Sequence, residues 1–244
     1  MNPVLQSLYE RKSVRVFEEK EISAEDKALI LKAAVMAPTA GNQQLYTILD
    51  VTDPDMKEAL SKSCDHQPFI AKAKMLLIFL ADCQKWYEGF INQGCEPRLP
   101  GPGDLMLAVS DANIAAQNAV TAAESLGIGS CFIGDIMENC EIHREMLHLP
   151  KYVFPAAMVV FGHPTKQQRE RRKPKRAEMK HIVHENTYRH MSKEELETLF
   201  SPKSGTQTYD EWMKAFCDRK YNSDFSLEMS RSVGVYLDAY QTYK

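Results

Sequence analysis

The sequence predicts an α+β fold in which helices sandwich a mixed β-sheet. Three observations lead to this prediction. Residues 75–80 (MLLIFL) and 152–162 are apolar runs, and the first is apolar at every position, as in a strand buried on both faces. Residues 105–126 form a long, alanine-rich helix that is apolar on more than one face. The strands and helices follow one another without strict βαβ periodicity, which favours α+β over a regular parallel sheet.

The N-terminal part is predicted to hold two helices separated by a basic segment. Residues 2–10 read as the first helix. Ser23 is typical of an N-cap, and the helix that it begins continues to about Met36. A polar loop, residues 39–44, then leads into the sheet.

The middle of the chain is predicted to alternate between strands and helices, with strand 46–51, helix 54–63 and strand 75–80. Residues 84–104 look less regular. Because aromatic residues on a loop often flank a pocket, we expect Trp86, Tyr87 and Phe90 to belong to a mobile cover. A surface excursion without a role is the alternative.

After the long helix, the pattern predicts a short strand within 129–135, a helix near 139–147 and a strand over 152–162. Three further helices are expected at 191–200, 208–219 and 224–240. We assign residues 1–190 to one domain and residues 191–244 to a helical extension that packs on the body or on a partner subunit.

Composition excludes several classes of protein. The net charge of −3 argues against a general polyanion binder. No apolar run approaches the ~20 residues that span a bilayer, and the N-terminus lacks a signal-peptide pattern, so we expect a cytoplasmic protein that does not contact membranes. The six cysteines form no C-x-x-C pair and have no histidine at ligand spacing, so neither a metal site nor a disulfide framework is expected.

Two segments contain the candidate binding residues. In an extended conformation, Arg11, Ser13 and Arg15 project to one side, and guanidinium groups with a hydroxyl suit a phosphate. The loop 38–44 offers amide donors and acceptors and contains Gly41. Together they suggest a ligand with a phosphate at one end and an amide-rich ring at the other. A solvated basic segment and an ordinary polar turn are the alternatives.

Several short motifs, in this order, resemble the FMN-dependent nitroreductase and flavin reductase family. They are R-K-S-V-R at 11–15, A-P-T-A-G-N-Q-Q at 37–44, G-I-G-S-C-F-I-G-D-I at 127–136, L-P-x-x-V-F-P at 149–155, K-P-K-R at 173–176 and H-E-N-T-Y at 184–188. The last motif and the helical tail resemble the larger, NADPH-preferring branch. The resemblance implies a nitroreductase-like fold, with residues 1–190 as the FMN-binding domain and the long helix at a subunit interface.

The resemblance also implies a homodimer with two FMN sites, each built from both chains. Arg11 would serve the phosphate and Arg15 the pyrimidine edge, where a cation stabilises the reduced flavin. Ile133 and Gly134 would place a backbone N–H against the flavin N5, so Arg15, Ile133 and Gly134 are the candidate catalytic residues. The remaining candidate cofactor-binding residues are Lys12, Ser13, Gly41, Asn42, Gln44, Gln67, Cys131, Lys173, Lys175 and Arg176.

The function that follows from the resemblance is hydride transfer from NAD(P)H through bound FMN to a small-molecule acceptor such as a nitroaromatic, a quinone or free flavin. One open face of the flavin would serve both substrates, which implies ping-pong turnover. No Walker or G-x-G-x-x-G loop is present, and a flavin enzyme needs none. The alternative is a regulatory module without turnover, which binds flavin or uses the basic run 166–180 to bind nucleic acid.

Overall fold

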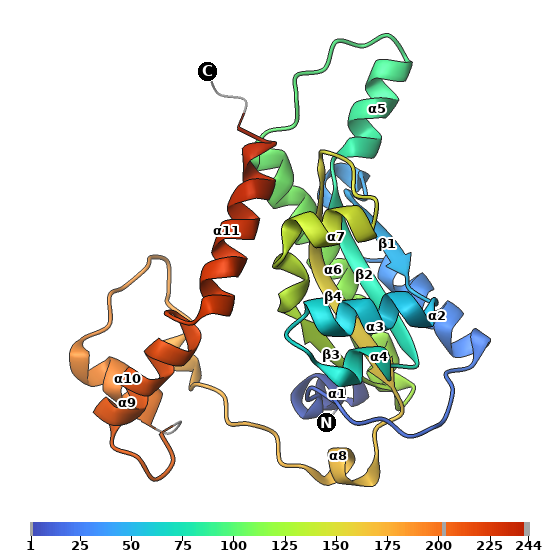
Figure 1. Cartoon of the computed structure of the whole chain (residues 1–244). Helices are drawn as coiled ribbons and strands as arrows, with labels where there is room; N and C mark the ends of the chain where they lie inside the picture. Colours follow the sequence, from blue (N-terminus) through green and yellow to red (C-terminus); the bar gives the residue numbers. More distant parts are fainter. Residues whose placement is uncertain (1, 202–203, 242–244) are drawn as a thin grey trace. The chain divides into compact units, whose positions relative to one another are not determined.

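The computed structural model describes residues 2–201 and 204–241, which divide into two compact units (Figure 1). The described residues up to Arg171 and from Glu228 onward form the first unit, and Arg172–Leu227 form the second. No helix in these residues is long and apolar enough to cross a membrane.

The first unit is built on one four-stranded sheet. Its strands are β1 (Tyr46–Asp50), β2 (Met75–Asp82), β3 (Gly129–Ile133) and β4 (Val153–Gly162), in the order β1-β2-β4-β3. All three pairings are antiparallel, so the expected mixed sheet is not found among these strands. The one parallel contact between described residues is an isolated bridge from Ser13 to Ser130. The α+β class itself is confirmed.

Both central strands are buried along their whole length, as predicted for residues 75–80. Successive side chains of a strand point to opposite faces, so Leu77 and Phe79 join one core and Leu76 and Ile78 the other. Figure 1 shows α6 (Pro102–Ser125) behind the sheet and α3 (Pro54–Ser63) in front of it. Six of the seven alanines of α6, all but Ala122, are fully buried and have no bulk beyond Cβ, which lets this long helix lie close to β2 and β4.

Local sequence signals place several helices where they were expected. Asp53 caps α3 by accepting a hydrogen bond from the Asp55 N–H at 3.1 Å. Ser23 likewise caps α2 (Ala24–Val35) by accepting from the Asp26 N–H at 3.0 Å. The other short helices of this unit are α1 (Pro3–Glu10), α4 (Pro68–Ala71), α7 (Cys140–Met146) and α8 (Lys166–Glu170), with 3₁₀ turns η1 (Ala40–Asn42) and η2 (Gly134–Met137).

The segment 84–104 is more regular than predicted. Residues Gln84–Asn92 form helix α5, in which Trp86 and Phe90, four residues apart, lie on one face with ring centroids 5.6 Å apart. The long helix α6 begins at Pro102 rather than at residue 105. Proline is accepted in the first turn of a helix because its missing N–H would have no intrahelical partner there. Asp104 accepts a hydrogen bond from the Gly101 N–H at 2.8 Å and closes this turn.

The second unit contains the 3₁₀ turn η3 (Met179–His181) and the helices α9 (Lys193–Phe200) and α10 (Tyr209–Lys220). Helix α11 (Asp224–Asp238) begins in the second unit and ends in the first. Its Tyr236, and Tyr240 just beyond it, are fully buried in the core of the first unit, so the end of the helical arm packs on the body. The division into domains at residue 190 stays a prediction.

The basic segment is held against the sheet by its backbone. The Val14 N–H donates to the Ser130 carbonyl at 2.9 Å, and the Glu18 N–H donates to the His163 carbonyl at 2.8 Å. The apolar side chains Val14 and Phe17 lie on two glycines of the sheet. A Cβ added to Gly129 would come within 2.6 Å of Val14, and one added to Gly162 within 2.6 Å of Phe17. The glycines therefore allow the segment to approach the sheet this closely.

We therefore expect Gly162→Ala to destabilise the protein by about 1–3 kcal/mol, because the new methyl group would displace the Phe17 ring. Gly89→Ala is the matched control, since a Cβ there meets nothing within 4 Å and alanine favours α5. Urea unfolding of the two variants measures the difference. A Gly162→Ala variant as stable as Gly89→Ala would show that the close approach does not constrain the segment.

Candidate functional site

The docked segment turns the predicted phosphate-binding side chains toward β3. Arg11, Ser13 and Arg15 all lie near the thiol of Cys131, which is buried. Burial raises the pKa of that thiol, while Arg15, Ser13 and Arg11 act in the opposite direction. Neither Arg11 nor Arg15 forms an ion pair with a carboxylate of the described residues. Two guanidinium groups and a hydroxyl are thus placed together and not neutralised, which suits an anion.

Lys12 points away from this group. Its ammonium donates to the carbonyl oxygens of Arg169 at 2.5 Å and Arg171 at 2.6 Å, at the end of α8. Successive side chains of an extended segment point to opposite sides, so the Lys12 side chain points away from those of Arg11 and Ser13. In this structure Lys12 therefore fixes α8 to the segment instead of joining the candidate ligands. Arg171, which the sequence did not single out, donates in turn to the Ser13 carbonyl at 2.7 Å.

Gln67 lies near the same group. It precedes α4, its side-chain amide donates to the Cys64 carbonyl at 2.9 Å, and Phe69 two residues later lies 5.9 Å from the Arg15 guanidinium carbon. Cys131 lies in β3, Ile133 is the last residue of that strand, and Gly134 is the first residue of η2, which follows it directly. Gln67, Ile133 and Gly134 are therefore on or beside the elements that surround the Arg11–Arg15 segment.

The polar loop 39–45 is organised by Asp111, a buried carboxylate of α6 that no sequence motif singled out. Asp111 accepts hydrogen bonds from the Thr39 hydroxyl, from the Ala40 N–H at 3.0 Å and from the Leu45 N–H at 3.1 Å. The loop has positive φ angles at Gly41 (56°), Asn42 (56°) and Gln44 (50°). Left-handed backbone at a glutamine is unfavourable and persists only where neighbouring groups hold it. Asp111 supplies that restraint and leaves Asn42 exposed.

The two groups of candidate residues lie at diagonally opposite corners of the sheet. Ser13 pairs with Ser130 on β3, which is one edge strand of the sheet, at the end of the sheet where β2 begins with Met75. The Leu45 carbonyl accepts a hydrogen bond from the Asp82 N–H at the opposite end of β2, beside the other edge strand, β1. Along the strands, the Ser13 and Leu45 positions are separated by the length of β2, roughly 23 Å for eight residues, and across the sheet by three strand spacings, roughly 14 Å. An arginine side chain cannot cover that distance, so the loop and the basic segment of one chain do not surround the same small ligand.

Lys173, Lys175 and Arg176 belong to the second compact unit. Lys175 and Arg176 line a surface hollow of that unit together with Glu178 and His181. Their assignment to a phosphate site stays a prediction.

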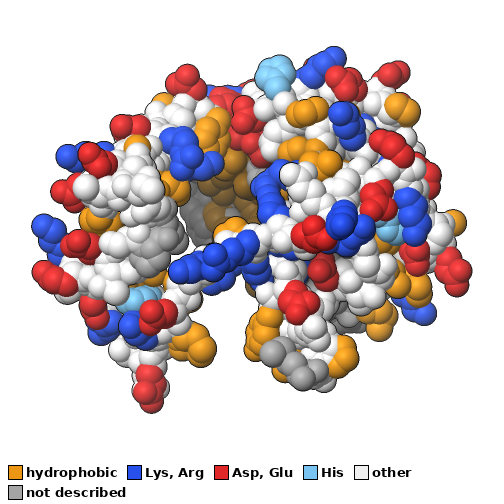
Figure 2. All heavy atoms as spheres, turned by 90° about the horizontal axis from the view of Figure 1, so that it is seen from below, with side chains coloured by type: hydrophobic (Ala, Val, Ile, Leu, Met, Phe, Trp, Pro, Cys, Tyr) orange, Lys and Arg blue, Asp and Glu red, His pale blue; other side chains and the backbone are white. Residues whose placement is uncertain are grey.

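The basic run 166–180 does not form a purely basic surface. Lys166 lies 3.8 Å from Glu170, Arg169 lies 3.0 Å from Glu18 and Lys180 lies 2.8 Å from Glu178. Figure 2 shows a row of lysine and arginine side chains near the middle of the face that it draws, with acidic and basic side chains interspersed around it. The ion pairs show that acidic side chains offset part of the charge of the run.

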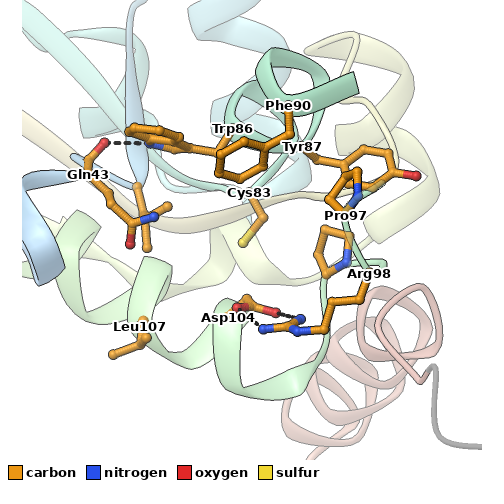
Figure 3. A pocket seen from close by; sticks show the side chains of 11 residues that line it. Gln43, Cys83, Trp86, Tyr87, Phe90, Pro97, Arg98, Asp104 and Leu107 are labelled. Atoms are coloured by element: carbon orange, nitrogen blue, oxygen red, sulfur yellow. Dashed lines mark hydrogen bonds and ion pairs between the residues drawn. The ribbon is translucent and has the colours of Figure 1, made fainter. Parts of the chain in front are cut away.

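A pocket of about 270 Å³ lies next to the polar loop (Figure 3). As predicted, Trp86, Tyr87 and Phe90 flank it, although they come from a helix and not from an irregular cover. The Trp86 indole donates to the Gln43 carbonyl at 2.8 Å, which joins the pocket wall to the loop. Asp104 and Arg98 form a bidentate pair on the opposite wall.

A serine–histidine pair lies elsewhere, between α3 and α7. The Ser63 hydroxyl lies 2.8 Å from His143 Nε2, and His143 Nδ1 lies 2.9 Å from the Ile136 carbonyl, to which it must donate. His143 is fully buried, and burial lowers its pKa. Because no substrate can reach the ring, this pair is a structural contact.

Glu138 follows the segment that contains Gly134 and is only 4% exposed. Its Oε1 has no hydrogen-bond partner among the described residues. Burial, together with the carboxylates of Asp135, Asp65 and Glu228, raises the pKa of Glu138 to about 7. The next residue, Asn139, donates its N–H to Glu228 of α11 at 3.1 Å. An acidic group that titrates near neutral pH thus lies where α11 meets the segment after β3.

Comparison with known proteins gives a consistent result. The model of a family described as "Nitroreductase family" matches residues 8–163. An FMN reductase (NAD(P)H) of Bacillus subtilis is 32% identical, over 98% of this chain and 92% of the relative. The structure of NfrA2 from B. megaterium has a TM-score of 0.83 at 26% identity and covers 100% of both chains. NfrA1 nitroreductase from B. subtilis has a TM-score of 0.79 at 27% identity, over 93% of this chain and 98% of that one.

The raised pKa of Glu138 makes stability depend on pH. The folded protein keeps this proton up to about pH 7, whereas an ordinary glutamate releases it near its usual value of 4.5. The folded state binds more protons between these values, so its stability falls as pH rises through them. Glu138→Gln removes this contribution. As the pH rises from 5 to 8, the free energy of unfolding of the variant should therefore increase by about 2 kcal/mol relative to that of wild type. Parallel pH–stability curves for the two proteins, from urea unfolding, would contradict the assignment.

Proposed function

Because the chain belongs to the nitroreductase family, we propose that it is an FMN-dependent oxidoreductase that passes electrons from NAD(P)H to a small-molecule acceptor. The observation that supports this most is the group formed by Arg11, Ser13 and Arg15 beside Cys131. Its donors fit a phosphomonoester, which presents several oxygens to forked guanidinium groups. The relative named FMN reductase supports the same cofactor and reductant.

In this proposal each residue has a defined task. Arg11 and Ser13 bind the cofactor phosphate, and Arg15 supplies positive charge where the reduced ring becomes more negative. Gln67 and the backbone of Ile133 and Gly134 orient the ring. FMN held by these residues would supply the hydride and electron chemistry that links NAD(P)H to the acceptor, and the two substrates would use the site in turn.

We further propose a homodimer in which each site takes its basic segment from one chain and its polar loop from the other. The support is the diagonal separation of the two groups, since Ser13 and Leu45 are tied to opposite ends and edges of the sheet. A two-fold axis can bring such groups together twice. Asn42, Gln44 and Gly41 would then face the cofactor held by the partner's arginines.

Nitroaromatics, quinones and free flavin are the proposed acceptors, and NADPH the preferred reductant. The cytoplasmic location stays a prediction. No feature of the described residues favours the regulatory alternative.

The first test is cofactor content and turnover. The purified protein should be yellow, release FMN on heating and oxidise NAD(P)H when an acceptor is added. Arg11→Ala should weaken FMN binding roughly ten- to a hundred-fold, as expected for a lost charge-assisted hydrogen bond of about 1.5–3 kcal/mol. Lys166→Ala, which removes an exposed cation of α8, is the control and should bind as wild type does. A colourless protein that takes up no FMN would refute the proposal.

The second test uses mixed dimers. One double variant carries Arg11→Ala and Arg15→Ala, and the other carries Asn42→Gly and Gln44→Gly, in which glycine accepts the left-handed backbone. Each alone should bind FMN weakly. If both chains build each site, random mixing makes about half of the dimers mixed, each with one intact site, so about a quarter of all sites regain normal affinity. If one chain held the whole site, mixing would restore none.

A further inference from the structure

The end of α8 and the basic segment hold each other by hydrogen bonds in both directions. The Lys12 ammonium donates to the Arg171 carbonyl at 2.6 Å, and the Arg171 guanidinium donates back to the Ser13 carbonyl at 2.7 Å. On α8 itself, Oε1 of Gln168, a side chain that is only 8% exposed, accepts from the Arg15 N–H at 3.4 Å. These contacts fix the position of the Arg171 guanidinium relative to the segment.

The charge of Arg171 is not balanced by a neighbour, unlike the charges of the two other cations of this region. Lys166 lies 3.8 Å from Glu170, and Arg169 lies 3.0 Å from Glu18. Arg171 forms no ion pair with a carboxylate of the described part of the chain. A guanidinium group has five N–H donors, and the bond to the segment uses one of them. Since Arg171 is exposed, a ligand from solvent can reach the other donors.

Arg171 adjoins the group that was assigned to the cofactor phosphate. The Ser13 carbonyl that it contacts and the Ser13 hydroxyl near Cys131 belong to one residue, so its guanidinium lies close to the side chains of Arg11, Ser13 and Arg15. Guanidinium groups of like charge repel one another, and an anion between them relieves this repulsion.

A phosphomonoester suits three such cations better than two. Its second pKa is about 6, so at neutral pH it carries nearly two negative charges on three acceptor oxygens. A dianion with that many acceptors can take a further charge-assisted hydrogen bond. A flavin whose side chain ends in a hydroxyl group offers neither the charge nor the oxygens.

We propose that Arg171 is a further ligand of the cofactor phosphate, and that it makes the site select a flavin with a terminal phosphate over riboflavin. This inference rests on the proposed function. Lys12 holds the Arg171 backbone, the Ser13 carbonyl orients its guanidinium, and the remaining donors bind the phosphate oxygens. Arg171 thereby connects the end of α8 to the ligand.

The test compares FMN with riboflavin, which has the same ring and ribityl chain but no phosphate. Protein freed of flavin is titrated with each, and the change in flavin fluorescence gives the Kd. Wild type should bind FMN more tightly than riboflavin. Arg171→Gln should raise the Kd for FMN roughly tenfold, as for a lost charge-assisted hydrogen bond, and leave that for riboflavin within about twofold. Retained riboflavin binding also shows that the variant is folded.

Two substitutions separate phosphate binding from a purely structural contact. Arg171→Lys and Arg171→Gln both keep a donor for the Ser13 carbonyl, but only lysine keeps the charge. The lysine variant should therefore retain most of the preference for FMN, and the glutamine variant should lose it. Equal behaviour of the two variants would show that Arg171 only fastens α8 to the segment, and would overturn the proposal. Lys166→Ala, the control on α8, should leave both Kd values unchanged.

The same titrations distinguish failure of this inference from failure of the proposed function. If wild type binds FMN and oxidises NAD(P)H but Arg171→Gln keeps the full preference for FMN, the assignment of Arg171 alone is wrong. Equal affinity of wild type for FMN and riboflavin would also overturn it. If wild type binds neither flavin, the proposed function is wrong, and this inference is wrong with it.

Discussion

The arrangement of the candidate site depends on one buried carboxylate. Asp111 on α6 accepts three hydrogen bonds from the loop 39–45, and without it two backbone N–H groups and a hydroxyl would lose this partner, the Leu45 N–H in a buried position. Because α6 is packed on the sheet through alanines, the position of the loop follows from the position of the helix. The left-handed turn at Asn42 and Gln44, and the wall of the aromatic pocket, are fixed by the same contact.

The opposite corner of the sheet is held in another way. There, Val14 and Phe17 lie on Gly129 and Gly162, and backbone hydrogen bonds tie the segment to β3 and to the end of β4. On the other side of the segment, the Lys12 ammonium donates hydrogen bonds to two carbonyl oxygens at the end of α8. These contacts direct Arg11 and Arg15 to one side of the segment without neutralising them. The nitroreductase family fold thus presents a cationic corner and an amide-rich corner on one chain, and the proposed homodimer is the assembly that unites them.

Charge is balanced differently in the three regions that bear on function. The Arg11–Arg15 group keeps its positive charge, which suits a phosphate. In the aromatic pocket, the charges of Arg98 and Asp104 balance each other. Around Glu138, carboxylates face one another, so one of them keeps a proton near neutral pH. Arginine and acidic side chains therefore behave differently in the three regions, according to whether an opposite charge lies beside them.

Features that depend on residues close together in the chain could be predicted before the fold was known. The caps at Ser23 and Asp53 and the wholly apolar run of β2 are local signals, and the motifs that indicate the family are short runs of adjacent residues in a fixed order. Contacts between residues far apart in the chain could not be predicted in this way and were found in the folded protein. Asp111 and Leu45 are 66 positions apart, and Lys12 and Arg169 are 157 apart. No periodicity encodes such pairs, because they exist only once α6 and the sheet have packed and brought the two chain segments within hydrogen-bonding distance.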